Sequence, residues 1–120
     1  MNLGKIEKNL VLKLSFNFSL CIIEYCDVLE VNKKYVIARQ LLKSGTSIGA
    51  NLMEAQHAES KSDFIHKLKI AAKEGEETEY WLLLCQHPKD YPDCHDLLLS
   101  IQELNRVVGK IISTSKGRID

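Results

Sequence analysis

The stretch that decides the fold runs from Gln40 to Leu84 and reads QLLKSGTSIGANLMEAQHAESKSDFIHKLKIAAKEGEETEYWLLL. Its second half repeats apolar or small residues every three or four positions, as one face of a long helix requires. These residues, which we call the seam, are Phe64, Leu68, Ala71, Gly75, Thr78, Leu82 and Cys85. A comparable stripe spans the first half: Ile37, Leu41, Ser44, Ile48 and Leu52. The pattern predicts two consecutive long helices.

Small residues interrupt both stripes. Gly45, Gly49 and Ala50 lie in the first helix and Gly75 in the second, although a glycine inside a helix costs about 1 kcal/mol relative to alanine. Close approach of two helix backbones would explain that cost. We therefore predict that these two helices pack unusually near each other through their small residues.

The whole chain has the size and composition of one soluble globular domain. Its 120 residues include 45% apolar and 27% charged residues, which suits a single domain over residues 1–120 rather than a disordered or fibrous chain. Only two prolines occur, Pro88 and Pro92, so nearly all the chain is free of the strongest helix breaker. The fold class expected is all-α.

The first segment is ambiguous in isolation. Its apolar residues alternate at the period of a strand from Leu10 to Leu20, but they also satisfy a helical stripe, and no turn dipeptide follows to start a hairpin. We favour a helix. A second apolar stripe, through Leu12, Phe16 and Ile23, exceeds what a four-helix monomer buries, which predicts contact with another subunit.

Capping residues place the helix boundaries. Asn32 is predicted to cap the second helix, Ser60 and Asp63 to form a capping box for the third, and Asp93 to cap the last, after a linker that holds both prolines. The predicted helices span residues 8–31, 33–57, 61–87 and 93–113. The segment after residue 113 is expected to fray.

Charge is balanced overall but uneven along the chain. Acidic and basic residues both number 16, so no overall field draws the chain to a polyanion. No acidic residue lies between Val31 and Met53. The basic run in this interval is a candidate nucleic-acid-binding site, or else a solvated face, and consists of Lys33, Lys34, Arg39 and Lys43.

The third helix carries its charges against its own dipole. Lysines come early and glutamates late: Lys61, Lys67, Lys69 and Lys73, then Glu74, Glu76, Glu77 and Glu79. This order is unfavourable, because a helix prefers anions at its start and cations at its end. We predict that acidic groups of a neighbouring helix or subunit lie beside the basic half.

Chemistry-bearing constellations are weak. Glu54 with His57, and Asp63 with His66, have the spacing of helical metal ligands, and Cys85, His87, Cys94 and His95 flank the linker without a zinc-knuckle spacing. A metalloenzyme using Glu54, His57 and His66 is an alternative that we set aside, and we expect no metal, no cofactor and no catalytic residue. The cysteines are expected to be reduced and mostly buried. Neither a signal peptide nor a membrane span is predicted, which favours the cytoplasm.

Polar residues recur on or near the seam. Ser44, Ser47, Asn51 and Thr78 must pair with one another or with backbone groups if they are buried. Such a network more often fixes the register of two helices than performs catalysis, so we predict a structural role. Tyr80 and Trp81 are predicted to be core or interface residues.

The central stretch strongly resembles the four-helix bundle proteins encoded by intervening sequences of bacterial large-subunit ribosomal RNA genes. These proteins are related to the accessory variability proteins of diversity-generating retroelements. The resemblance is carried by Gln40, Leu41, Ser44, Ser47, Ile48, Asn51, Glu54, Ala55, Ser60, Asp63, Phe64, Ala71, Glu77 and Thr78. It implies an antiparallel up-down four-helix bundle that assembles as a homopentameric ring, and no catalytic residue.

Two functions are expected from this resemblance and from the charges. The first is a non-enzymatic oligomer that binds RNA or a ribonucleoprotein through the basic run. The second is a protein-interaction scaffold that never touches nucleic acid, which the chain's neutrality favours. Lys43 stands where many members of the family carry arginine, which keeps the charge but loses the planar fork that grips phosphate.

Overall fold

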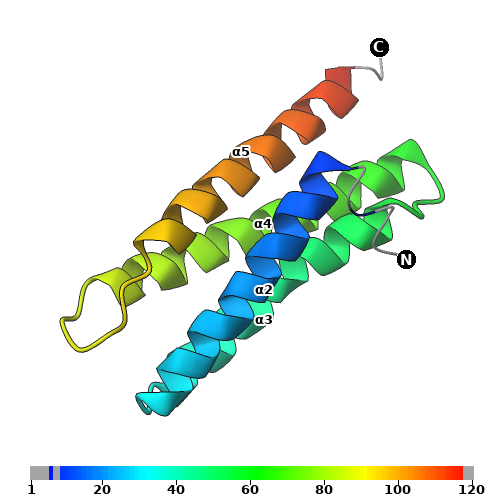
Figure 1. Ribbon diagram of the computed structural model, residues 1–120. Coiled ribbons are helices and arrows are strands. Elements are labelled where there is room, and N and C mark those ends of the chain that lie inside the picture. The colour runs from blue at the N-terminus through cyan, green and yellow to red at the C-terminus, as the bar shows by residue number, and fades with distance from the viewer. Residues whose placement is uncertain (1–5, 7–8, 118–120) are drawn as a thin grey trace.

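The computed structural model describes residue 6 and residues 9–117. They contain four long helices: α2 (Leu10–Val31), α3 (Tyr35–Ala55), α4 (Lys61–Gln86) and α5 (His95–Gly117). Consecutive helices run in opposite directions and form an up-down bundle (Figure 1). The predicted all-α class is confirmed, and the ambiguous first segment is a helix from Leu10 onward. The predicted start at residue 8 lies outside the described residues.

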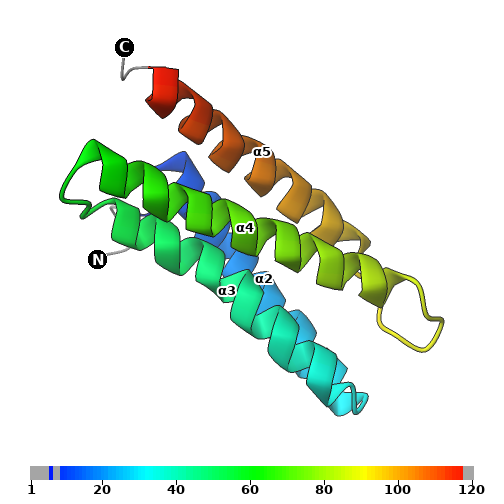
Figure 2. The same cartoon turned by 180° about the vertical axis from the view of Figure 1, so that it is seen from behind.

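The bundle is elongated, with extents of 50 × 28 × 20 Å. We call the end with the α2–α3 turn and the α4–α5 linker the linker end. The opposite end, with the α3–α4 turn and the end of α5, is the open end. Contact between helices is most extensive for α3 with α4, which lie side by side in the reverse view (Figure 2). Among the four pairs of helices in contact, it is least extensive for α2 with α5.

The predicted seam forms the centre of the core. Leu68, Ala71, Gly75, Thr78, Leu82 and Cys85 are buried in α4, and Leu41, Ser44, Ile48 and Leu52 are buried in α3. Phe64 and Ile37, at the ends of the two stripes, are only half-buried. Because burying one large aliphatic side chain contributes about 1.5–3 kcal/mol, these buried residues contribute substantially to the stability of the bundle.

The glycines have different neighbours from those predicted. A Cβ on Gly45 would lie 2.9 Å from Cγ2 of Ile22 in α2, and one on Gly49 would lie 3.5 Å from the hydroxyl oxygen of Ser15. Gly75 instead meets Asn105 of α5. The glycines therefore relieve the α2–α3 and α4–α5 contacts, and the prediction that they bring α3 near α4 is wrong.

Helix geometry explains this difference. Successive residues of a helix point about 100° apart. Gly45 and Gly49 each directly follow a residue that faces α4, so they turn towards α2. Ala50 is exposed and contributes to neither contact. Apolar periodicity gives the buried arc of a helix but does not say which neighbour each part of that arc meets.

The turn between α2 and α3 also differs from prediction. Asn32 is not the N-cap of α3 but the C-cap of α2, where its Nδ2 donates to the carbonyl oxygen of Val28 at 2.8 Å. Lys33 then takes a left-handed backbone conformation with φ of 64°, and α3 begins at Tyr35. The asparagine amide bonds back to the helix it ends, which leaves Lys34 at the start of α3 without a side-chain cap.

The other boundaries are close to those predicted. Ser60 Oγ accepts from the amide of Asp63 at 3.0 Å, which confirms the cap, although Asp63 Oδ2 reaches the amide of Glu59 rather than that of Ser60. Asp93 accepts from the amide of His95 at 3.4 Å, where α5 begins. The last helix continues to Gly117, so the prediction of fraying is wrong for residues 114–117. Residues 118–120 lie outside the described residues.

The thiols agree with the expectation from sequence. All four cysteines are free; Cys21 is exposed, and Cys26, Cys85 and Cys94 are buried. Among the helices of the described residues, none combines the length and the apolar character that crossing a membrane would require.

Candidate nucleic-acid interface

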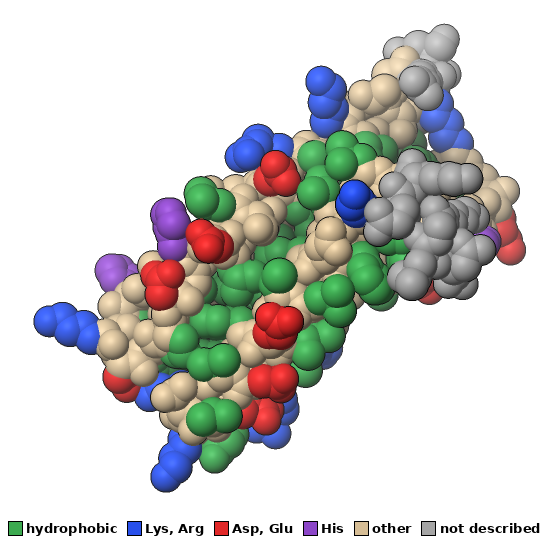
Figure 3. Space-filling view, viewed as in Figure 1, with side chains coloured by type: hydrophobic (Ala, Val, Ile, Leu, Met, Phe, Trp, Pro, Cys, Tyr) green, Lys and Arg blue, Asp and Glu red, His purple; other side chains and the backbone are tan. Residues whose placement is uncertain are grey.

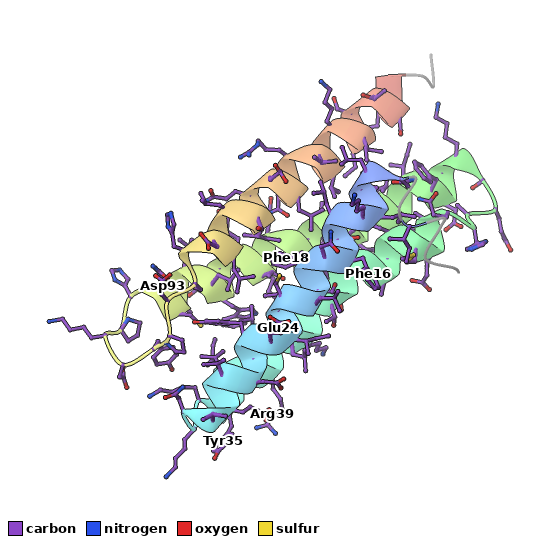
Figure 4. The ribbon with its side chains drawn as sticks, in the orientation of Figure 1. Phe16, Phe18, Glu24, Tyr35, Arg39 and Asp93 are labelled. Carbon is purple, nitrogen blue, oxygen red and sulfur yellow. The ribbon has the colours of Figure 1, made fainter. Side chains whose placement is uncertain are left out.

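The predicted basic run lies at the linker end and continues onto α3. Lys33 is exposed in the α2–α3 turn, and Arg39 and Lys43 are exposed on α3. Because they are four residues apart in one helix, Arg39 and Lys43 share a face. Figure 4 shows Arg39 and Tyr35 together near the start of α3, at the edge of the bundle. The structure thus places three cations on accessible surface, in the α2–α3 turn and along the first half of α3.

Lys34 differs from its neighbours in the run because it has a partner. Its Nζ lies 2.7 Å from Oδ2 of Asp90 and 4.8 Å from the ring centroid of Tyr91, both in the α4–α5 linker. The hydrogen bond between Lys34 and Asp90 raises the pKa of the lysine and lowers that of the aspartate. Among the described residues, Lys33, Arg39 and Lys43 form no ion pair.

The linker that supplies Asp90 is held in place by hydrogen bonds from two helices. Tyr25 of α2 donates its hydroxyl to the carbonyl oxygen of Pro92 at 2.7 Å. Gln86 of α4 donates to Asp93 Oδ1 and accepts from the amide of Cys94, each at 2.8 Å. The bond from Gln86 lowers the pKa of Asp93. The carboxylate of Asp90 is therefore carried on an ordered loop beside Lys34.

Buried thiols line the same end of the core. Burial raises the pKa of Cys26 to about 12 and that of Cys85 to about 11. It also raises the pKa values of Tyr25 and Cys94. The Cys94 thiol donates to the carbonyl oxygen of Leu82 at 3.3 Å. These groups stay protonated at neutral pH, so they have the character of core side chains and lack that of nucleophiles.

The four predicted network residues divide into two kinds. Thr78 Oγ1 lies 2.9 Å from Ser44 Oγ and 2.7 Å from the carbonyl oxygen of Glu74, and both side chains are fully buried. Ser47 and Asn51 are half-buried and bond within α3, to the carbonyl oxygens of Lys43 and Ser47. The structure brings Ser44 and Thr78 together across the seam, whereas the other two stay on their own helix.

One lysine in the basic half of α4 has the acidic neighbour that was predicted, and the candidate metal ligands are not brought together. Lys67 Nζ lies 3.9 Å from Glu54 Oε2 at the end of α3, which confirms for Lys67 that an acidic group of a neighbouring helix lies beside the basic half. His57 and His66 are exposed. Within the described residues, no three histidine, cysteine or acidic side chains gather closely enough to hold a metal ion.

Exposed apolar residues follow one side of α2. Leu20, Ile23 and Val28 keep 47%, 42% and 45% of their surface exposed, and hydrophobic side chains are visible along α2 in Figure 3. Phe18 is buried and Phe16 half-buried, and the two lie on different sides of the helix (Figure 4). A small cavity of 120 Å³ separates part of α2 from α5. Glu24 and Asp27 are exposed among these residues, so the apolar surface of α2 is interrupted by acidic side chains. Several large apolar side chains left exposed on one helix are nevertheless typical of an interaction surface.

Two comparisons place this architecture among known proteins. Residues 7–112 match the family described as 23S rRNA-intervening sequence protein. The chain is also similar to the crystal structure of a protein with unknown function from the S23 ribosomal protein family of Bacteroides thetaiotaomicron VPI-5482. The two are 39% identical, the TM-score is 0.77, and the match covers 85% of this chain and 97% of the other. Among curated proteins, none matches this sequence.

Proposed function

Because the chain belongs to the 23S rRNA-intervening sequence protein family, we propose that it is a non-enzymatic, homo-oligomeric bundle that binds RNA through exposed cations at its linker end. The observation that carries the proposal is that Lys33, Arg39 and Lys43 are exposed and form no ion pair with any described residue. The names of the matching family and of the similar structure refer to ribosomal RNA and to a ribosomal protein family. No catalytic activity is indicated for the family.

Neutrality of the chain limits what one copy can do. Lysines and arginines equal aspartates and glutamates in number, so binding to a polyanion depends on the local patch and falls steeply as salt rises. Repetition of the patch around a ring strengthens it, because several copies can engage one RNA and the effective concentration for each later contact is high. Arg39 offers a bidentate grip on phosphate, and the two lysines act as point charges.

Assembly into such a ring is supported by the exposed apolar side chains of α2. Leu20, Ile23 and Val28 are each more than two-fifths exposed, and burial of apolar surface against a second copy contributes about 25 cal/mol for each Å². Light scattering on the size-exclusion peak tests this part of the proposal. We expect a mass several times the 13.6 kDa of one chain, and five times for the pentamer that the resemblance implies. A peak at the mass of one chain would contradict assembly.

A gel-shift assay with structured RNA at about 50 mM salt tests the RNA-binding part. We expect a shift that the triple variant K33E/R39E/K43E abolishes. The matched control is K73E/R106E/K110E, which reverses the same residue types at exposed positions elsewhere. The control should retain the shift. An equal loss from both variants, or no shift with the unaltered protein, would refute RNA binding by this surface.

A protein-interaction scaffold is the second candidate, and an apolar group on α4 favours it. Tyr80, Leu83 and Leu84 are 56%, 50% and 41% exposed, and a cavity of 280 Å³ is lined by Leu83, Gln86 and His87. Copurification with and without nuclease separates the two candidates. Partners held through RNA are lost after digestion, whereas partners docked on α4 remain and are lost in L83D/L84D.

A further inference from the structure

A second basic region lies at the open end, away from the predicted run. It surrounds a cavity of 510 Å³ between the start of α4 and the end of α5. The residues that line it are Lys61, Ser62, Ile65, His66, Lys69 and Lys116. This volume falls in the range of sites that hold small organic ligands. The other cavities of the described residues quoted above, near α2 and α4, are smaller.

Every ionisable side chain that lines the cavity is basic. They are the side chains of Lys61, Lys69, Lys116 and His66, and among the described residues no carboxylate lines the cavity. In the described structure none of the three lysines forms an ion pair. Lys67, by contrast, turns to α3 and meets Glu54. A concave site lined by charge of one sign concentrates the field within it, so the cavity attracts anions.

The remaining lining residues complete a site for an organic anion. Ser62 brings a hydroxyl group that can donate a hydrogen bond, and Ile65, which is only 7% exposed, gives the cavity an apolar wall. Lysine ammonium groups each offer three donors without a fixed geometry, which suits the several oxygens of a phosphate better than the two of a carboxylate.

We propose that this cavity binds the phosphate group of a nucleotide, with the apolar wall against the sugar or base. This site is distinct from Lys33, Arg39 and Lys43, which lie in the α2–α3 turn and the first half of α3, and it does not depend on RNA binding there. The phosphate could belong to a free nucleotide or to the end of an RNA strand, because both present the same phosphomonoester.

Amide chemical-shift titrations of the full chain test the site directly. Inorganic phosphate, a 5′-mononucleotide, its unphosphorylated nucleoside and acetate are added separately, with chloride held constant. We expect saturable shifts around Lys61 to Lys69 and near Lys116 with the two phosphates, and at least tenfold weaker binding of the nucleoside and of acetate. Shifts that never saturate, or equal binding of acetate and phosphate, would overturn the proposal.

Variants then assign the binding to these side chains. K61A/K69A should weaken binding of the mononucleotide at least tenfold, whereas K73A/K110A, which removes the same charge at exposed positions outside both proposed sites, should leave its affinity unchanged. All four lysines are exposed, so both variants are expected to fold. Equal weakening by the two variants would contradict the site, because it would show only a general effect of net charge.

A final arm identifies the source of the phosphate. Short RNA strands with a 5′-phosphate and with a 5′-hydroxyl are compared with the mononucleotide. Tighter binding of the phosphorylated strand than of the mononucleotide supports an RNA end as the ligand, and the reverse order supports a free nucleotide. Equal binding of the two strands combined with no competition by the mononucleotide would overturn the proposal. Because K61A/K69A and the K33E/R39E/K43E variant described above alter different residues, failure of one site leaves the test of the other intact.

Discussion

The two ends of the bundle use their basic residues differently. At the linker end, Lys34 is neutralised by Asp90, on a loop tied down by Tyr25 and Gln86. At the open end, Lys61 and Lys69 line a cavity without an acidic partner among the described residues. At the linker end the loop supplies a carboxylate to a lysine, whereas the α3–α4 turn at the open end supplies none to Lys61 or Lys69 among the described residues. A chain of zero net charge can therefore hold a local cluster of basic side chains.

Packing should show the largest difference between the ends. Leu29, fully buried near the linker end, is compared with Ile65, which lines the open-end cavity. We expect Leu29→Ala to lower the free energy of unfolding by about 2–5 kcal/mol. Ile65→Ala should cost clearly less, because one side of that side chain already faces open space. Urea denaturation measures both, and equal losses would show that the open end is packed as tightly as the linker end.

Titration of the buried thiols should give the next largest effect. Above about pH 9 the unfolded chain loses thiol protons that the folded chain keeps, because the pKa of Cys26 is raised to about 12 and that of Cys85 to about 11. The unfolded state then binds fewer protons, so stability falls as pH rises, on the order of 1 kcal/mol per pH unit. Unfolding free energies measured from about pH 8 to about pH 11 should show this decline.

The control for the thiol prediction is the double variant C26A/C85A. Its absolute stability will change because the side chains differ, but its loss of stability with rising pH should be smaller than that of the unaltered chain. Parallel pH profiles for the two proteins would mean that the thiols do not carry the effect.

The tie between α2 and the linker should contribute a smaller amount. Tyr25→Phe removes the hydroxyl that donates to the carbonyl oxygen of Pro92, and a typical hydrogen bond contributes about 1 kcal/mol net. Tyr80→Phe, on the exposed side of α4, is the matched control and should change little. Thermal or urea unfolding compares them. If Tyr25→Phe were as harmless as its control, the linker would not be fixed by this bond.

The smallest expected effect is the change in RNA affinity when Lys34 is replaced. Because Asp90 already pairs with it, Lys34→Ala should weaken RNA binding less than Arg39→Ala does. Asp90→Asn should strengthen binding, since it frees a cation at the same surface. Fluorescence anisotropy with labelled RNA measures all three variants. Equal weakening by Lys34→Ala and Arg39→Ala would indicate that the ion pair opens when RNA binds.

Much of the fold follows from local patterns in the sequence. The contacts that side chains make with other helices and with the linker do not. The repeat from Leu68 to Cys85 predicts a helix face because that face is set within one helix. The neighbour of Gly75 is on α5, and the partner of Lys34 is in the linker, so neither can be found from spacing along one helix. Lys116 was missed for a related reason, since it lies in a segment that sequence alone predicts to fray.

The salt dependence of RNA binding is the measurement that tests the proposed function most directly. Affinity is measured over a range of salt for the unaltered chain, for K33E/R39E/K43E and for K73E/R106E/K110E. If the linker-end cations contact phosphates, removing three of them should reduce the slope of log affinity against log salt by about 2–3. The control should keep the original slope. Identical slopes for the unaltered chain and K33E/R39E/K43E would contradict the account.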